Sequence, residues 1–130
     1  MIDISALKTA LATYDEIIAR YDRESNDDAI RDALIQRFEY TYSLTVKILM
    51  RYVKEALPQS PDELTFNETI RSANKLGLLL SNLEKWSNYR QKRNLSSHTY
   101  NLDVAMQIVK ITKDFQCEVH YLIDKIVEKL

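Results

Sequence analysis

Apolar residues recur along this chain at the three- and four-residue steps that define one face of a helix. Near the beginning, six of them fall on a single stripe: Ile4, Leu7, Leu11, Tyr14, Ile18 and Tyr21. The polar segment RESNDD (23–28) then breaks the pattern and offers capping residues for a following helix. The sequence therefore predicts a first helix that buries one face.

The segment from about Asp28 to Leu57 predicts a second helix, which is long for a globular protein. It carries two apolar stripes instead of one. The first comprises Ile30, Leu34, Phe38, Thr41, Thr45, Ile48 and Tyr52, and the second Ile35, Tyr42, Val46, Leu49 and Val53. A helix that is apolar on two sides is either central in its bundle or covered by a partner chain. The pattern leaves both arrangements open.

The segment LPQSPDEL (57–64) contains both prolines of the chain and predicts a loop. Two helix starts compete after it. SPDE (60–63) places proline at the first helical position, and TFNE (65–68) has the form of a capping box. We favour the second start, for a helix that ends near Leu76 with Gly77, the only glycine, as its left-handed terminator.

Two more helices are predicted, from about Ser81 to Leu95 and from about Asn101 to the end of the chain. Apolar positions of the last helix again follow helical steps: Val104, Ile108, Ile111, Phe115, Val119, Leu122, Ile126 and Leu130. One glycine and two prolines in 130 residues supply few of the turns that a sheet needs. We expect an all-α fold, an up-and-down bundle of about five helices that forms one domain over residues 1–130.

The composition narrows the class of protein. Hydrophobic residues make up 45% of the chain and charged residues 28%, which argues against a disordered chain. No apolar run approaches the roughly 20 residues that span a bilayer, so we expect no membrane partner. The single cysteine, Cys117, excludes an internal disulfide, and its place in a helical pattern favours a packed thiol over a reactive one. This cysteine usage favours a reducing, cytoplasmic setting.

The net charge of −1 conceals an uneven distribution. Residues 1–28 contain seven acidic and three basic side chains, whereas residues 85–100 contain four basic side chains and no acidic one. Because the whole chain is not basic, it is poorly suited to coating nucleic acid, and we expect no binding to DNA. The local excess instead favours a site for phosphate or RNA, to which Arg90 and Lys92 would contribute.

The basic region leads into KRNLSSHTY (92–100), where polar groups of several kinds are concentrated. Arg93 and His98 are five positions apart, or about 140° around a straight helix, so they would not share a helix face. The two serines between them compete for backbone hydrogen bonds in a helix interior. We therefore expect the helix to end near Leu95 and the chain to turn, which would bring His98 beside Arg93.

An arginine and a histidine together suit one reaction in particular. Guanidinium binds phosphate through paired N–H donors, and imidazole exchanges a proton near neutral pH. These groups fit cleavage of a phosphodiester by its own 2′-hydroxyl, which requires no metal and no other cofactor. One histidine cannot easily serve as both base and acid, but a homodimer with the cleft on its twofold axis would supply two. The alternative is that these polar groups only satisfy carbonyls at a helix end.

The other polar residues give weaker evidence of a functional site. Glu39 lies within RFEYTYSL on a largely buried helix, where a buried acid would require a cation such as Arg93 and would support the site. A solvent-facing Glu39 is equally compatible with the pattern. We interpret His120 as a packing or surface residue. Tyr100 follows the helix break, where solvent would reach its hydroxyl. No motif with metal-ligand spacing is present, so we expect no metal site.

The stretch RNLSSHTY resembles the signature of HEPN-domain proteins, which have an arginine, a polar residue, a histidine after four intervening residues and a tyrosine two positions later. RDALIQRFEYTYSLTVKILMRYV resembles the early long helix of the nucleotidyltransferase substrate-binding protein family within that superfamily. EKWSNYRQKRNLSSHTY, with Trp86, resembles the signature helix of the same family. The resemblance extends from about Ala29 to the C-terminus.

This resemblance implies an all-α homodimer that is paired with a small nucleotidyltransferase. In one interpretation the chain is a metal-independent RNase toxin, silenced when its partner transfers AMP from ATP to a tyrosine. Arg93 and His98 would then be catalytic, Asn94 would support the site, and Tyr100 would accept AMP. In the other, the chain is a non-catalytic substrate- or nucleotide-binding subunit of a two-component nucleotidyltransferase. A plain dimerisation bundle is a third interpretation, and the sequence does not choose between them.

Overall fold

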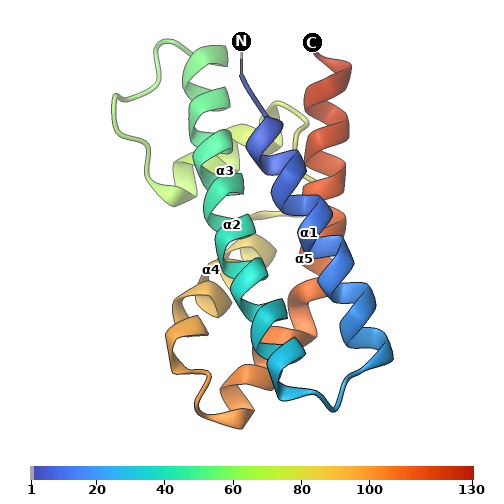
Figure 1. Cartoon of the computed structure of the whole chain (residues 1–130). Coiled ribbons are helices and arrows are strands. Elements are labelled where there is room, and N and C mark those ends of the chain that lie inside the picture. The colour runs from blue at the N-terminus through green and yellow to red at the C-terminus, as the bar shows by residue number, and fades with distance from the viewer. Residues whose placement is uncertain (1) are drawn as a thin grey trace.

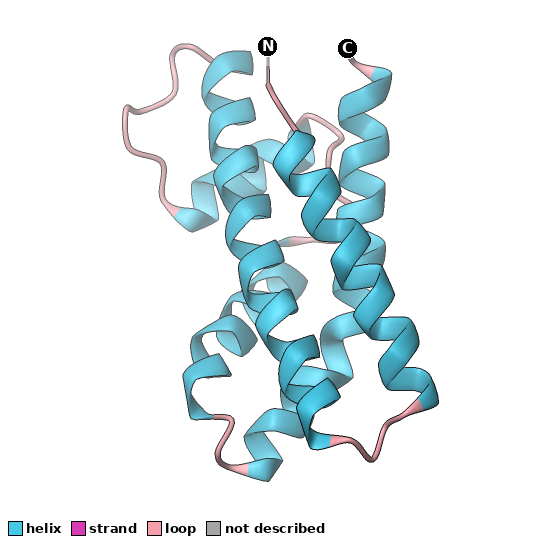
Figure 2. Ribbon diagram, viewed as in Figure 1, coloured by secondary structure: helices cyan, strands magenta, loops and turns pink. Residues whose placement is uncertain are grey.

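The computed structural model describes residues 2–130, which contain helices and loops but no strand (Figures 1 and 2). The predicted all-α class is confirmed. In chain order the elements are α1 (Ser5–Arg23), α2 (Asp28–Ala56), α3 (Phe66–Lys75), α4 (Leu83–Leu95), the short 3₁₀ helix η1 (Ser96–His98) and α5 (Leu102–Glu128). Within the described residues, none of these helices is both long enough and apolar enough to cross a membrane.

The three long helices α1, α2 and α5 run side by side along the molecule, and the shorter α3 and α4 pack along the remaining side (Figure 1). α2 contacts every other helical element. Ten of the twelve positions in its two apolar stripes are buried within the chain: Ile30, Leu34, Ile35, Phe38, Thr41, Tyr42, Thr45, Ile48, Leu49 and Val53. The other two, Val46 and Tyr52, are half-buried and pack against the core. Of the two arrangements that its pattern allows, α2 therefore adopts the central position in the bundle.

An aromatic cluster forms the middle of the core around Phe115 of α5. Its ring lies 5.2–6.3 Å, between centroids, from five other aromatic rings. These rings come from α1, α2 and α4: Tyr14, Phe38, Tyr42, Trp86 and Tyr89. Because edge-to-face and tilted contacts of this kind stabilise beyond the area they bury, Phe115 joins four helices into one core.

Local sequence signals fix the ends of α3. Thr65 and Glu68 form the predicted capping box, each side chain accepting the other residue's amide at 3.1 Å. Gly77 has a φ of 76°, and its amide and the next one donate to the carbonyls of Asn74 and Ala73. The second of the two competing helix starts is therefore the one used, and the glycine terminates the helix as predicted.

The remaining helix bounds differ from the predicted ones by small amounts. The predicted burial of one side chain, in contrast, was wrong. α4 begins at Leu83 after the N-cap Asn82, slightly later than expected. Cys117 is exposed, so the expectation of a packed thiol was wrong. The core-facing stripe of α5 runs through Phe115, Glu118 and Val119, which leaves position 117 on the outer face.

Candidate functional site

The polar motif lies at one end of the bundle, opposite the end at which both chain termini lie (Figure 1). α4 ends at Leu95, and the three residues of η1 follow it. Asn101 then caps α5 by accepting the amides of Asp103 and Val104 at 2.9 and 3.4 Å. The predicted helix end and turn are confirmed, and the turn is held between two helix termini.

Arg93 projects from the last turn of α4 and is half-buried. Within residues 2–130, no carboxylate forms an ion pair with its guanidinium. Arg93 and Arg90 lie close enough to Tyr42 to act on its phenol. Burial raises the pKa of Tyr42 to about 12, while the two positive charges oppose that rise. The charge of Arg93 is thus available to an anion.

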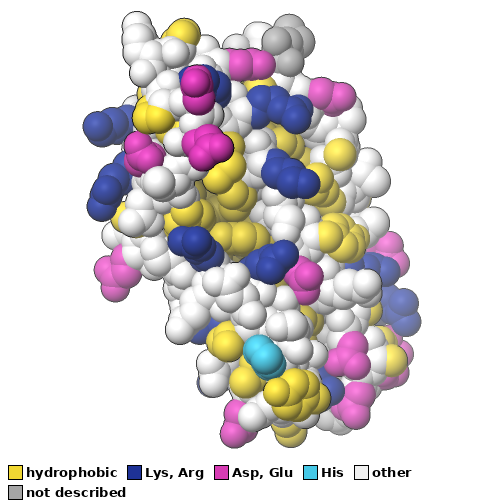
Figure 3. All heavy atoms as spheres, turned by 90° about the vertical axis from the view of Figure 1, so that its left-hand side faces the viewer, with side chains coloured by type: hydrophobic (Ala, Val, Ile, Leu, Met, Phe, Trp, Pro, Cys, Tyr) yellow, Lys and Arg dark blue, Asp and Glu magenta, His cyan; other side chains and the backbone are white. Residues whose placement is uncertain are grey.

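The neighbouring cations differ in how they are held. The guanidinium of Arg90 lies 4.9 Å from the ring centroid of Phe66, in a cation–π contact. Nζ of Lys92 donates to the amide oxygens of Asn88 and Gln91 at 3.1 and 3.4 Å. Both contacts hold a cation without neutralising it. Figure 3 shows the face formed by α2, α3 and α4, where Lys and Arg side chains border an apolar hollow.

His98 and Tyr100 form an exposed pair on the turn. Nδ1 of His98 is 3.3 Å from the hydroxyl of Tyr100, and the two rings meet edge to face with centroids 5.9 Å apart. Nε2 of His98 has no hydrogen-bond partner among the described residues. Tyr100 is 85% exposed, and Asn94 is exposed as well. The second imidazole nitrogen and the phenol oxygen are therefore open to solvent.

The turn brings Arg93 and His98 to the same end of the bundle without joining them. Within residues 2–130 the guanidinium of Arg93 makes no hydrogen bond with the imidazole of His98, whose partner is Tyr100. His98 is exposed, and Arg93 is half-buried. The two side chains would act on one ligand only if a phosphate were bound between them, or between the Arg93 and His98 of two copies of the chain.

For Glu39 of α2 the sequence allows two possibilities, a cation partner or a solvent-facing side chain, and the structure shows neither. It is half-buried, and its Oε2 accepts a hydrogen bond of 2.6 Å from Oγ of Ser96. It forms no ion pair with Arg93 in the described part of the chain, so the structure places a hydroxyl, and not a guanidinium, beside this carboxylate. Sequence reasoning treated Ser96 only as a helix breaker, because nothing local indicates a contact 57 positions away.

A fully buried carboxylate lies away from the motif. Glu118 is 1% exposed and accepts the amide of Leu80 at 3.3 Å. Burial, followed by the charges of Glu118 and Asp114, raises the pKa of Tyr89. The Tyr89 hydroxyl and the indole N–H of Trp86 are buried without a partner in residues 2–130. The pattern gave no sign of this cluster, which lies inside the α4–α5 contact.

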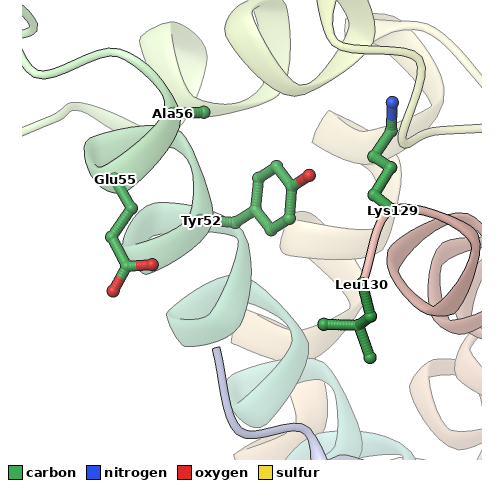
Figure 4. A pocket seen from close by; sticks show the side chains of 5 residues that line it. All are labelled: Tyr52, Glu55, Ala56, Lys129 and Leu130. Carbon is green, nitrogen blue, oxygen red and sulfur yellow. The ribbon is translucent and has the colours of Figure 1, made fainter. Parts of the chain in front are cut away.

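The remaining polar features lie apart from the motif. His120 is exposed on α5, with Nε2 3.0 Å from both carboxylate oxygens of Asp15, which confirms its interpretation as a surface residue. A cavity of about 320 Å³ lies beside the C-terminal end of α2 (Figure 4). It is lined by Tyr52, Glu55, Ala56, Lys129 and Leu130. Among the described residues, no three His, Cys, Asp or Glu side chains are grouped as metal ligands would be.

A five-helix bundle that carries arginine, histidine and tyrosine in this spacing at the end of α4 defines a HEPN-like protein. The comparisons with known proteins place the chain more narrowly. It belongs to the family described as nucleotidyltransferase substrate binding protein like, whose profile matches residues 2–128. The family membership expected from the sequence is thereby confirmed.

Two relatives from Haemophilus influenzae illustrate the family. The chain is 30% identical, over 104 residues, to a protein named probable ribonuclease HepT, in an alignment that covers 78% of this chain and 70% of the relative. A solved structure is described as the fold of a substrate binding domain of a nucleotidyltransferase. It matches with a TM-score of 0.87 and 25% identity, over 95% of this chain and 98% of that one.

Proposed function

We propose that this chain is a metal-independent endoribonuclease of the toxin type, in which Arg93 and His98 cleave RNA across a homodimer. The observation that carries the proposal is that, within residues 2–130, the Arg93 guanidinium has no carboxylate counter-ion and the His98 imidazole has an open Nε2, both at one end of the bundle. The relative named as a probable ribonuclease supports the same activity.

The chemistry follows from what these groups can do. An imidazole acting as base takes the proton of the ribose 2′-hydroxyl, whose oxygen forms a bond to the adjacent phosphorus. The bond from phosphorus to the 5′-oxygen breaks, and a protonated imidazole gives that oxygen a proton. The products are a 2′,3′-cyclic phosphate and a 5′-hydroxyl. In a homodimer the two roles fall to the two copies of His98, and Arg93 stabilises the charge that develops on the phosphate.

Four further side chains are assigned supporting parts in this proposal. Among the described residues, Arg90 and Lys92 form no ion pair with a carboxylate, so their charges remain available to the phosphates that flank the cleaved bond. Asn94 is exposed beside Arg93, where its amide can donate to a phosphate oxygen. Glu39 acts indirectly, by holding the turn that it contacts at Ser96.

The same site provides a route to silencing. A nucleotidyltransferase partner would direct the Tyr100 oxygen to the α-phosphorus of ATP, forming a P–O bond as pyrophosphate leaves and the phenol proton passes to a base. Tyr100 is exposed enough to enter another enzyme's site, and its oxygen lies 3.3 Å from the His98 ring. The attached AMP would place a negative charge where RNA phosphate must bind, and would therefore block cleavage.

The chain offers a matched pair of histidines for the test. Purified protein in EDTA should cleave RNA and leave 2′,3′-cyclic ends. The variant His98→Ala should lose about a hundredfold or more of the rate, since general acid–base groups contribute on that order. His120→Ala removes the other exposed histidine and should cleave as the wild type does. Equal rates for wild type and His98→Ala, in protein that is folded by circular dichroism, would refute the nuclease proposal.

A second function is favoured by the family description and by the similar solved structure, both of which refer to substrate binding for a nucleotidyltransferase. In that case the chain is a non-catalytic subunit, and its basic segment presents a nucleotide or an acceptor to the partner. Calorimetry should then show binding of nucleotide or of the nucleotidyltransferase, and the partner's choice of substrate should change without any RNA cleavage. Absence of both kinds of binding would dismiss this function.

A further inference from the structure

Ser96 occupies the point at which α4 passes into the 3₁₀ helix η1, and it joins three parts of the molecule. Its Oγ lies 2.6 Å from Oε2 of Glu39 on α2. The same oxygen lies 2.6 Å from the carbonyl oxygen of Arg93, one turn back on α4. A single hydroxyl therefore connects the arginine of the motif, the start of the turn that carries His98, and a helix 57 positions earlier.

The hydroxyl has one proton and two acceptors, so the two contacts compete. A carboxylate is the stronger acceptor, because hydrogen bonds to an ionised group are roughly twice as strong as those between neutral groups. The carbonyl of Arg93 also receives the backbone N–H of Ser96 and does not depend on the hydroxyl. The Ser96 side chain is therefore directed mainly at Glu39, and it binds the turn to α2.

The rest of the turn is anchored by the ends of α4 and α5 that flank it, and less by contacts of its own side chains. None of the three residues of η1 is buried, and no side-chain hydrogen bond caps its beginning. Ser97 and His98 are exposed, whereas Ser96 is half-buried. Leu95 packs partly against the core on the α4 side. Within residues 2–130, the hydrogen bond between Ser96 and Glu39 is the polar link between this segment and α2, while η1 also packs on α4 and α5.

We propose that Ser96 and Glu39 are positioning residues, which hold the turn against α2 and thereby fix where Arg93 and His98 present their groups. The inference rests on the proposed nuclease function, because position matters most when two groups must meet one phosphate. Catalytic geometry tolerates errors of only about 0.5 Å before the rate falls. Neither positioning residue has to touch RNA.

The adjacent serine supplies a matched control for the kinetic test. Ser96→Ala should lower kcat for RNA cleavage about tenfold or more and leave KM within about twofold, since misplacement affects the reacting step more than binding. Ser97→Ala removes an exposed hydroxyl from the next position and should match the wild type. Ser96→Thr keeps a hydroxyl and should restore most of the rate. A Ser96→Ala rate equal to that of Ser97→Ala would overturn the inference.

Glu39 provides a second route to the same contact. Glu39→Gln keeps an acceptor oxygen and should retain more activity than Glu39→Ala. The double variant Glu39→Ala with Ser96→Ala should be no slower than the slower single variant, because both changes remove one interaction. Fully multiplicative losses would show that the two residues act separately and would count against the pair.

Hydrogen exchange separates this inference from the nuclease proposal, because it requires no RNA. Amides of residues 96–100 should exchange several-fold faster in Ser96→Ala than in Ser97→Ala, while amides in the middle of α5 stay equally protected in both. If the wild type does not cleave RNA, the nuclease proposal fails, and faster exchange in this segment still supports the link to α2. Equal exchange in the two serine variants would overturn the link itself.

Discussion

At the scale of single residues, the site is defined by groups that lack partners as much as by those that have them. Arg93 has no carboxylate beside it in the described chain, although its half-burial would normally favour one. Glu39 is near enough to the turn to reach Ser96 but binds the hydroxyl instead of a cation. The arrangement leaves a positive charge uncompensated, as a site for an anion requires.

A variant of Tyr100 that lacks only the phenol oxygen would separate the proposed silencing by AMP from the proposed RNA cleavage. Tyr100→Phe keeps the ring against His98 and removes the atom that would accept AMP. When the variant is co-expressed with the partner nucleotidyltransferase, intact mass should show no added nucleotide, and RNA cleavage should continue. The wild type should gain mass and lose activity under the same conditions. Tyr40→Phe, which alters another exposed tyrosine, is the control and should be silenced normally.

Sequence reasoning identified the motif residues but not their contacts. Arg93, His98 and Tyr100 stand out because their spacing is local and the helix break between them has a local cause. The bond from Glu39 to Ser96 spans 57 positions, and the burial of Glu118 depends on how α4 packs on α5. Such contacts arise from tertiary packing, which no periodicity encodes. The exposed Cys117 was misplaced for a similar reason, because a small apolar residue fits either face of a helix.

At the scale of elements, local signals determined most helix ends. The capping box at Thr65 and the terminator Gly77 were both identified in advance, since each relies on residues within one turn. The two stripes of α2 were also correct, but whether the chain itself covers them is a question of packing. The structure answers that question, because α2 contacts all the other helical elements.

Gly77 provides a direct test of how α3 ends. Its φ of 76° is one that other residues adopt with strain, yet a Cβ at this position would meet no atom within 4 Å. Gly77→Ala should therefore lower the free energy of unfolding by about 1 kcal/mol, from backbone strain alone. Gly77→Asn should cost less, because asparagine tolerates this conformation better. Urea unfolding measures both, and an unchanged midpoint for Gly77→Ala would contradict the assignment.

At the scale of the whole molecule, one aromatic cluster holds the bundle together, and three of its members are tyrosines. Burial raises the pKa of all three tyrosines: to about 12 for Tyr42, and well above the ordinary value for Tyr14 and Tyr89. In the unfolded chain a phenol titrates near pH 10. The stability that the neutral phenol of Tyr42 contributes is therefore present in full below pH 10 and is lost as the pH rises from 10 towards 12, because over that range mainly the unfolded state releases the proton.

The loss of stability at alkaline pH should be measurable with a single substitution. Tyr42→Phe keeps the ring beside Phe115 and removes one of these protons. The variant should lose about 2 kcal/mol less stability than the wild type between pH 10 and pH 12, by denaturant unfolding at each pH. The free energy of unfolding of Tyr100→Phe, which lacks an exposed phenol, should fall with pH as steeply as that of the wild type. Parallel curves for Tyr42→Phe and wild type would contradict the role of burial.

The aromatic cluster also gives the protein an optical reporter of its own. Trp86 is the only tryptophan in the chain, and it lies buried against Phe115 on α4, two turns before Arg93. Its fluorescence spectrum reports whether water reaches that part of the core. Any event at the motif that loosens α4, whether a bound strand, an attached nucleotide or a second subunit, can therefore be followed by emission wavelength, without adding a dye.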